Sequence, residues 1–195
     1  MENINYQLFM MINVTPDSPL WLIELAKFLV EQAINIIPIV LLIAWLWVPR
    51  RELVIKTLIA LAFGVVLAKA LGMFFPHVRP FIQGVGYQLL GHSNTPSFPS
   101  NHGMGAFIFA LSFLFWNRSG IGICFMAWAL GIAWSRVYLG VHWPMDMVGA
   151  FMVALVSCFL TQWVWSLWGK SFLANSEKIY HRVFILPIKK SWVKY

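Results

Sequence analysis

The chain has 195 residues, of which 60% are hydrophobic and only 11% are charged. Soluble domains carry about 25% charged residues, whereas apolar runs of roughly 20 residues, long enough to cross a bilayer, recur along this chain. The composition excludes an ordinary soluble protein and predicts an all-α, polytopic membrane helix bundle that forms one domain over residues 1–195. The net charge of +7 does not indicate a nucleic-acid partner, because in such a protein the position of each charge matters more than their sum.

We expect an interfacial segment followed by five membrane spans. Residues 1–19 mix apolar and polar side chains, which is typical of a short helix at the membrane surface. The first residues lack the basic region of a cleavable signal peptide, so we expect the spans themselves to target the chain. The predicted spans cover residues 20–48, 53–75, 101–116, 120–139 and 144–168. Residues 170–195 form a basic, aromatic tail.

The second predicted span carries a stripe of small residues. Ala60, Gly64, Ala68 and Gly72 repeat every four residues, a spacing that places them on one face of a helix. Small residues at this spacing let a neighbouring membrane helix approach closely. We therefore expect close helix packing along this face.

The positions of Lys and Arg predict the orientation of the chain. Five spans place alternate connections on opposite sides of the membrane. Nine of the 14 Lys and Arg residues then share one side, in Arg50, Arg51, Arg118 and the basic tail. The positive-inside rule makes this side cytoplasmic. The loop 76–100, which is the longest polar connection, and the turn around His142 are then expected together on the outer face of the membrane.

Two arginines and one helix start on this outer face are suited to binding an anion. Arg79, followed by Pro80, lies just after the second span, and Arg136 lies near the end of the fourth. Planar guanidinium groups match the geometry of phosphate oxygens. Ser100 stands where it can cap the third span, so that free backbone N–H groups of that helix would face the same anion.

Two histidines and one aspartate supply reactive groups beside this anion site. His102 and His142 can each take or give a proton near neutral pH. Asp146 lies four residues after His142, so its carboxylate can accept the Nδ1 proton and leave Nε2 as a nucleophile. A structural ion-pair cluster that closes two helices is the alternative interpretation. The acidic residues and histidines lack the spacing of a metal site, so we expect neither a metal ion nor another cofactor.

Together these residues resemble the three-part signature of the type 2 phosphatidic acid phosphatase (PAP2) superfamily. The three parts are Arg79-Pro80, Pro99-Ser100-x-His102, and Ser135-Arg136-x5-His142-x3-Asp146. The resemblance spans residues 79–146 and, with the flanking helices, most of the chain. It implies a six-helix or similar α-bundle that hydrolyses phosphate esters without a metal ion.

The resemblance also implies a role for each residue of the signature. His142 would be the nucleophile that forms a phosphohistidine, Asp146 would orient it, and His102 would protonate the leaving group. The residues implied to bind the phosphoryl oxygens are Arg79, Pro80, Ser100, Asn101 and Arg136.

The sequence departs from the PAP2 pattern at two positions. The lysine that usually stands seven residues before the arginine of the first part is replaced by Gly72. Lys69, one helical turn earlier, could reach the interface with its long side chain, and we include it among the candidate phosphate-binding residues. Asn101 stands where the family usually has glycine, and its backbone N–H could still serve.

Within the superfamily, the chain is similar to the BcrC-type bacterial undecaprenyl-diphosphate phosphatases. Arg79-Pro80-Phe81, Ser97-Phe98-Pro99-Ser100 and the tail sequence at 186–193 carry this similarity. It implies hydrolysis of a polyprenyl diphosphate, drawn from the membrane lipids, on the periplasmic face of the bacterial inner membrane. It also implies recycling of the lipid carrier for peptidoglycan and other cell-wall polymers, and bacitracin resistance. It does not indicate an oligomeric state.

Three further points stay open at this stage. The same chemistry could act on another lipid, such as phosphatidylglycerophosphate or phosphatidate, or could transfer a phosphoryl group to lipid A, because the phosphate site is common and a lipid groove is only apolar surface. A transporter or scaffold is the alternative from another functional class. We expect His77 and His92, both in the loop 76–100, to be solvated, with contact to a second phosphate as the alternative.

Overall fold

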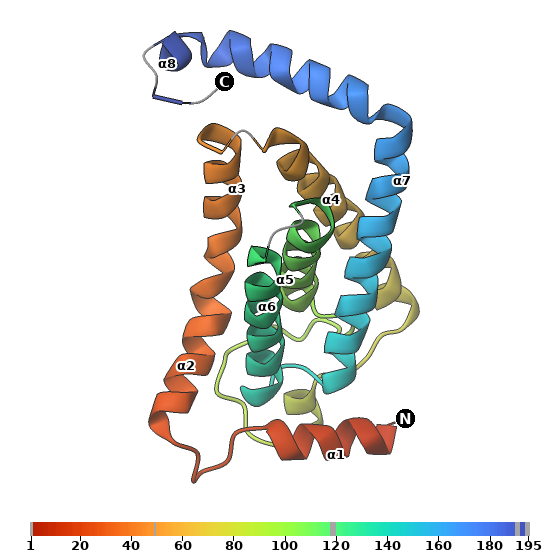
Figure 1. Cartoon of the computed structure of the whole chain (residues 1–195). Coiled ribbons are helices and arrows are strands. Elements are labelled where there is room, and N and C mark those ends of the chain that lie inside the picture. Colours follow the sequence, from red (N-terminus) through yellow and green to blue (C-terminus); the bar gives the residue numbers. More distant parts are fainter. Residues whose placement is uncertain (1, 49, 118–119, 190–191, 194–195) are drawn as a thin grey trace.

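The computed structural model describes residues 2–48, 50–117, 120–189 and 192–193, and over these residues it contains helices and no strand. This confirms the all-α fold class. The α-helices are α1 (Glu2–Ile12), α2 (Leu20–Glu31), α3 (Ile36–Leu46), α4 (Arg51–Phe74), α5 (Asn101–Ser112), α6 (Ile121–Tyr138), α7 (Pro144–Val183) and α8 (Ile185–Lys189). Short helices η1 (Ala33–Asn35), η2 (Pro80–Gln83) and the π-helix η3 (Phe113–Asn117) connect or extend them. The long helices stand side by side, and α1 lies across one end of the bundle (Figure 1).

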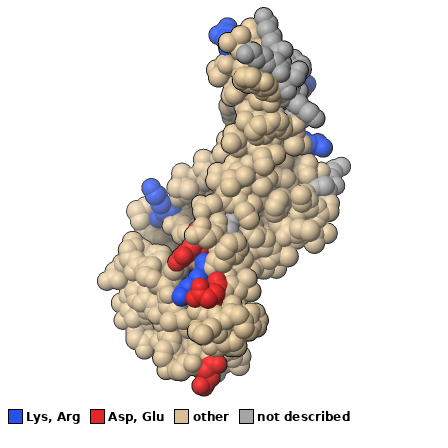
Figure 2. Space-filling model, turned by 90° about the vertical axis from the view of Figure 1, so that its left-hand side faces the viewer, with Lys and Arg blue, Asp and Glu red and all other residues tan. Residues whose placement is uncertain are grey.

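The described helices include three that are long and apolar enough to cross a membrane by themselves. These are α4, α6 and α7, and the pair α2–α3, which is bent by 49°, could form a fourth span. The predicted span over residues 20–48 is therefore not one straight helix. Pro38 lies in the first turn of α3, where its ring and missing N–H interrupt the preceding helix. The face drawn in Figure 2 is mostly free of charged side chains, as a membrane-embedded surface requires.

The span predicted over residues 101–116 corresponds to α5 and η3, which together are shorter than the other spans. After its first turn, α5 is almost entirely buried, so it forms the centre of the bundle. Gly64 shows how closely α4 approaches it, since a Cβ atom added there would lie 2.6 Å from Ile108 Cδ1 and 2.9 Å from Met104 Sδ. The small residues of α4 thus permit the close packing that their spacing predicts.

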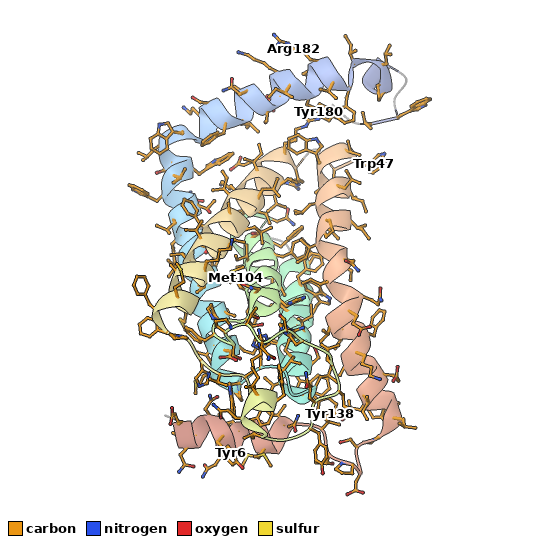
Figure 3. All side chains as sticks on the ribbon, turned by 180° about the vertical axis from the view of Figure 1, so that it is seen from behind. Tyr6, Trp47, Met104, Tyr138, Tyr180 and Arg182 are labelled. Carbon is orange, nitrogen blue, oxygen red and sulfur yellow. The ribbon has the colours of Figure 1, made fainter. Side chains whose placement is uncertain are left out.

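Helix α7 continues well past the predicted end of its span at residue 168. It forms one helix of 40 residues to Val183, and its last part bends across the end of the bundle opposite α1 (Figure 1). Figure 3 shows Tyr180 on the side of this part that faces the bundle and Arg182 on the opposite side. The guanidinium carbon of Arg51 lies 3.9 Å from the centre of the Tyr180 ring. The tail is therefore packed against the bundle through part of its length. The orientation prediction also used Arg118, Lys190 and Lys194, which lie outside the described residues.

The N-terminal segment is joined to the opposite end of the bundle by hydrogen bonds. Asn13 Nδ2 donates to the carbonyl oxygens of Tyr87 and Tyr138, each at 3.0 Å, and Asn13 Oδ1 accepts from the Tyr87 N–H at 2.7 Å. Gly140 has φ +78°, and a Cβ atom there would collide with the Tyr87 carbonyl oxygen. The turn after α6 therefore requires glycine, both for its left-handed backbone and for the close approach of the loop.

Phe9 and Asn5 attach α1 to the start of α7. The Phe9 ring is fully buried and lies 5.0 Å from the Trp143 ring, measured between centroids. Asn5 Oδ1 accepts a hydrogen bond from the Met145 N–H at 3.0 Å, which satisfies one of the free N–H groups at the start of α7. Helix α1 therefore braces the segment that carries His142 and Asp146.

Candidate active site

The short turn between α6 and α7 holds His142 at the end of the bundle where α1 lies. Pro144 begins α7, where its fixed φ and missing N–H are tolerated. Asp146 Oδ2 accepts a hydrogen bond from the Trp143 N–H at 2.8 Å, which caps the helix and places a negative charge at its positive end. The local sequence thus explains why Asp146 turns back toward His142.

The two ring nitrogens of His142 have different partners, and these partners define its tautomer. Nδ1 lies 3.2 Å from Asp146 Oδ2, and Nε2 lies 3.2 Å from Arg79 Nη1. A guanidinium nitrogen can only donate, so Nε2 carries the lone pair and Nδ1 carries the proton that Asp146 accepts. The residue is only 2% exposed. The arrangement keeps a neutral imidazole with its nucleophilic nitrogen toward the arginine.

Ser97 is a further member of this group that the sequence interpretation did not assign a role. Its hydroxyl donates to Asp146 Oδ2 and lies 3.3 Å from His142 Nδ1. Ser97 is buried, so these contacts are shielded from water. Its position in Ser97-Phe98-Pro99-Ser100 was part of the family resemblance, but spacing alone carries no signal that it contacts residues nearly 50 positions away.

Arg79 is held in place by the loop that follows it. Its Nε donates to the Thr95 carbonyl oxygen at 2.8 Å, its Nη2 to Thr95 Oγ1 and the Pro96 carbonyl oxygen at 3.2 Å each, and its Nη1 to the Val141 carbonyl oxygen at 2.9 Å. Burial lowers the pKa of Arg79, and the charge of Asp146 opposes this shift. The guanidinium is therefore oriented before any substrate arrives, with Nη1 directed to His142.

Arg136 is buried with donors that have no partner. The side chain is 1% exposed, and its Nε and Nη2 atoms have no hydrogen-bond partner among the described residues. A buried, permanently charged guanidinium with unused donors is costly unless an anion satisfies it. Arg136 lies on the last turn of α6, where the positive charge of Arg79 also acts on it. Two positive charges at this end of the bundle favour the binding of such an anion there.

The start of α5 contributes the remaining predicted residues. Ser100 Oγ accepts from the Gly103 N–H at 3.3 Å, so Ser100 caps α5 as the sequence predicted. Asn101 and His102 occupy the first turn, with Asn101 exposed and His102 half-buried. Pro80 is buried at the start of η2, directly behind Arg79. The structure thus brings Arg79, Ser100, Arg136, His142 and Asp146 to one end of the bundle, together with the helix turn that carries His102.

Lys69 is not brought into this group. It lies on the exposed face of α4, next to the exposed Val65, Val66 and Met73, and has no ion pair with another described residue. Gly72 lies close to the loop that carries Ser97. A Cβ atom there would lie 3.3 Å from the Phe98 carbonyl oxygen, so a larger residue would require this loop to shift by a few tenths of an ångström.

His77 contacts the second oxygen of Asp146, contrary to the expectation that it is simply solvated. Its Nδ1 lies 3.7 Å from Asp146 Oδ1, an atom that has no hydrogen bond among the described residues. Interaction with Asp146 raises the pKa of His77, partly opposed by burial. Two histidines therefore flank the carboxylate, His142 at Oδ2 and His77 at Oδ1.

An apolar groove of about 890 Å³ leads along the outside of the bundle to this carboxylate. Its polar end is formed by Glu2, Asn5, His77 and Asp146. Its apolar walls come mainly from Leu67 and Leu71 of α4, Phe75 just after α4, and Val148, Met152 and Val156 of α7. Within the described part of the chain, no group of three or more His, Cys, Asp or Glu residues is arranged to hold a metal ion.

We expect hydrolysis to persist at a pH at which an ordinary histidine is protonated. Burial lowers the pKa of His142 to about 4, and the hydrogen bond with Asp146 only partly opposes this. Because the nucleophile must be neutral, kcat/KM should fall on the acid side only near pH 4. A histidine with the ordinary pKa of 6.5 would lose about 30-fold by pH 5. An acid limb of kcat/KM centred near pH 6.5 would contradict this prediction.

The same pKa shift of His142 makes the free energy of unfolding depend on pH. Because its pKa is lower in the folded than in the unfolded chain, folding favours the neutral imidazole. This contribution to stability is complete above pH 6.5 and is lost as the pH falls from about 6.5 through about 4. If activity returns at pH 7 after brief exposure to acid, and tryptophan fluorescence does not change during the exposure, then the loss of activity at low pH comes from titration of His142 and not from unfolding.

Comparison with known proteins identifies the family. Residues 53–170 match the PAP2 superfamily. The chain is 44% identical over 196 residues to a protein of Escherichia coli K12 named "Putative undecaprenyl-diphosphatase YbjG", with 100% of this chain and 99% of that protein covered. It is 30% identical to undecaprenyl-diphosphatase BcrC of Bacillus subtilis 168, covering 80% and 82% of the two chains.

Solved structures show the same fold at lower sequence identity. The crystal structure of Aquifex aeolicus LpxE superposes with a TM-score of 0.70 at 23% identity, covering 82% of this chain and 94% of that one. A PAP2-type phosphatidylglycerolphosphate phosphatase from Bacillus subtilis superposes with a TM-score of 0.61, also at 23% identity, covering 83% and 84%. The family match over residues 53–170, the relative covered over nearly its whole length and the shared helical fold all point to the same family. This chain therefore belongs to the PAP2 superfamily.

Proposed function

We propose that the protein hydrolyses undecaprenyl diphosphate to undecaprenyl phosphate and inorganic phosphate through a phosphohistidine, without a metal ion. The observation that carries this proposal is the pairing of His142 with two groups at once. Asp146 accepts the Nδ1 proton at 3.2 Å, and Arg79 directs a donor to Nε2 at 3.2 Å. A nucleophile already adjacent to a phosphate-binding group needs little rearrangement to attack phosphorus.

In the first step, the lone pair of His142 Nε2 attacks the terminal phosphorus. The phosphorus–oxygen bond to the bridging oxygen breaks, and the lipid monophosphate leaves with that electron pair, while His102 donates a proton to it. When the phosphoryl group enters between them, Arg79 Nη1 donates to its oxygens instead of to His142 Nε2, and Arg136 supplies its unused Nε and Nη2 donors. These charges neutralise the transferring group in the transition state.

In the second step, water attacks the phosphohistidine. His102, now deprotonated, takes a proton from this water, and the bond between Nε2 and phosphorus breaks to release inorganic phosphate. Asp146 stays ionised throughout and stabilises the positive charge that develops on the imidazole ring of His142. Ser97 holds the same oxygen of Asp146 and so fixes the orientation of the carboxylate.

The names of the relatives support a polyprenyl diphosphate as substrate. Two of them, with similarity extending over most of their length, are called undecaprenyl-diphosphatases. The apolar groove between α4 and α7 fits a substrate with a long hydrocarbon chain, because its walls are apolar and only its end beside Asp146 is polar.

We further propose that the site faces the periplasm and that the product recycles the lipid carrier for cell-wall synthesis. The active-site end and the basic C-terminal part of α7 lie at opposite ends of the bundle (Figure 1). Placing the tail in the cytoplasm by the positive-inside rule puts the site on the other side. Undecaprenyl phosphate formed there would return to carry another wall precursor, and this removal of the diphosphate would protect against bacitracin.

A lipid panel tests the substrate assignment. We expect purified protein in detergent to release phosphate from undecaprenyl diphosphate at least about tenfold faster, by kcat/KM, than from phosphatidylglycerophosphate, phosphatidate or lipid A. The rate should be unchanged by excess chelator, because the side chains supply all the positive charge in this mechanism. Equal rates on all four lipids would remove the substrate preference, and loss of activity with chelator would refute the metal-independent mechanism.

A further inference from the structure

His92 lies beside the nucleophile although no part of the family signature includes it. Its ring centre is 6.0 Å from the ring centre of His142, with the two planes at 79°. The side chain is half-buried and comes from the loop between η2 and α5. Its Nδ1 lies 3.1 Å from the carbonyl oxygen of Ser93. A carbonyl oxygen only accepts, so Nδ1 carries the proton and Nε2 of His92 remains available for another partner.

The charges around His92 are positive. Arg79 and Arg136 both act on it electrostatically, and His92 in turn acts on His102. Burial and these two arginines lower the pKa of His92, whereas its bond to the Ser93 carbonyl raises it. The carboxylate of the site, Asp146, contacts His142 at Nδ1, away from the nucleophilic nitrogen. His92 therefore belongs to the positively charged, anion-binding side of the site.

Other groups on that side already account for the phosphoryl group that is transferred. A transferring phosphoryl group has three non-bridging oxygens, and the site offers it Arg79, Arg136 and the free N–H groups at the Ser100-capped start of α5. His102 serves the bridging oxygen in the proposed mechanism. His92 has no task in the transfer of a single phosphoryl group, yet it lies within reach of the same anion.

We propose that His92 binds the second phosphate of the substrate, the one that leaves with the lipid, and so makes the enzyme prefer diphosphates to monophosphates. This inference rests on the proposed function and assigns one residue to the substrate class. The neutral imidazole of the free enzyme would take up a proton as the negative diphosphate arrives, because nearby negative charge stabilises the protonated form. The bound His92 then donates a charge-assisted hydrogen bond to the leaving phosphate.

The test compares two substrates that share one lipid and differ by one phosphate, farnesyl diphosphate and farnesyl monophosphate. For His92→Ala we expect kcat/KM to fall by about 10- to 100-fold on the diphosphate and by less than about threefold on the monophosphate. His92→Gln should recover part of the loss, because its amide can still donate a hydrogen bond. Asn94→Ala, an exposed change in the same loop, is the matched control and should alter neither value.

Competition by inorganic anions gives a second measurement that does not need monophosphate turnover. The inhibition constant of inorganic diphosphate should rise about tenfold or more in His92→Ala, whereas that of inorganic phosphate should stay within about threefold of the wild type. Equal changes for both anions, or no change in any assay, would overturn the role of His92. Wild-type protein that fails to hydrolyse the diphosphate at all would instead refute the proposed function, so the two failures are distinct.

Discussion

Replacing His142 with alanine is expected to lower phosphate release from undecaprenyl diphosphate by at least about 10⁴-fold, because it removes the nucleophile. Nε2 of His142 is the atom that Arg79 approaches at 3.2 Å, and Asp146 holds the opposite ring nitrogen. Of the histidines described at this end of the bundle, only His142 has a carboxylate within hydrogen-bond distance of one ring nitrogen and an arginine at the other. Steady-state phosphate release by purified protein measures the effect.

Two controls make the His142→Ala result specific. His181→Ala changes a histidine on the distant C-terminal part of α7 and should leave the rate unaltered. Wild-type protein quenched during turnover should carry phosphate that is stable in alkali and labile in acid, and this label should be absent from His142→Ala. Full activity in the folded variant, or a label on another residue, would refute His142 as the nucleophile.

Arg136→Met is expected to lower kcat/KM by about 10³-fold while leaving the protein at least as stable as the wild type. Loss of a guanidinium that neutralises a transferring phosphoryl group has effects of this size. Stability should not fall, because in the protein without substrate the Nε and Nη2 donors of buried Arg136 make no hydrogen bond that would offset the cost of burying its charge. Enzyme kinetics and thermal unfolding of the same preparations measure both effects.

Measuring kcat/KM and thermal stability together distinguishes a phosphate-binding role of Arg136 from a structural one. An arginine that only supports the fold would lower stability when replaced, and activity would fall with it. Arg136→Lys should lie between wild type and Arg136→Met, because it keeps the charge and loses the planar fork. Arg182→Met, at an exposed position on α7, is the matched control. Unchanged kcat/KM in folded Arg136→Met would rule out phosphate binding by this residue.

The sequence predicts the parts of the site that depend on local spacing. The four-residue separation of His142 and Asp146, with Pro144 between them, is sufficient to predict that a helix start turns the carboxylate toward the ring. Ser100 as the cap of α5 follows from the same kind of rule. The apolar runs and the small-residue stripe likewise predict a helical membrane bundle with close packing at Gly64.

Contacts between distant segments could not be predicted in this way. Ser97 reaches Asp146 only because the loop folds back over the start of α7, and the same loop passes close to Gly72 of α4. The end of α7 was missed for another reason. Hydropathy reports where a helix would leave the membrane, and a change to polar residues after residue 168 does not itself stop a helix.

The attachment of the N-terminal segment makes it part of the same cooperative unit as the catalytic end. Asn13 bonds to the backbone of both the loop at Tyr87 and the end of α6, and Asn5 bonds to the start of α7. Segments joined in this way open together in native-state hydrogen exchange. The amides of α1 and of the turn that carries His142 should therefore exchange with one common opening free energy. An event that pulls α1 away at the membrane surface would then disturb the turn that carries His142, without requiring the membrane-spanning helices to move.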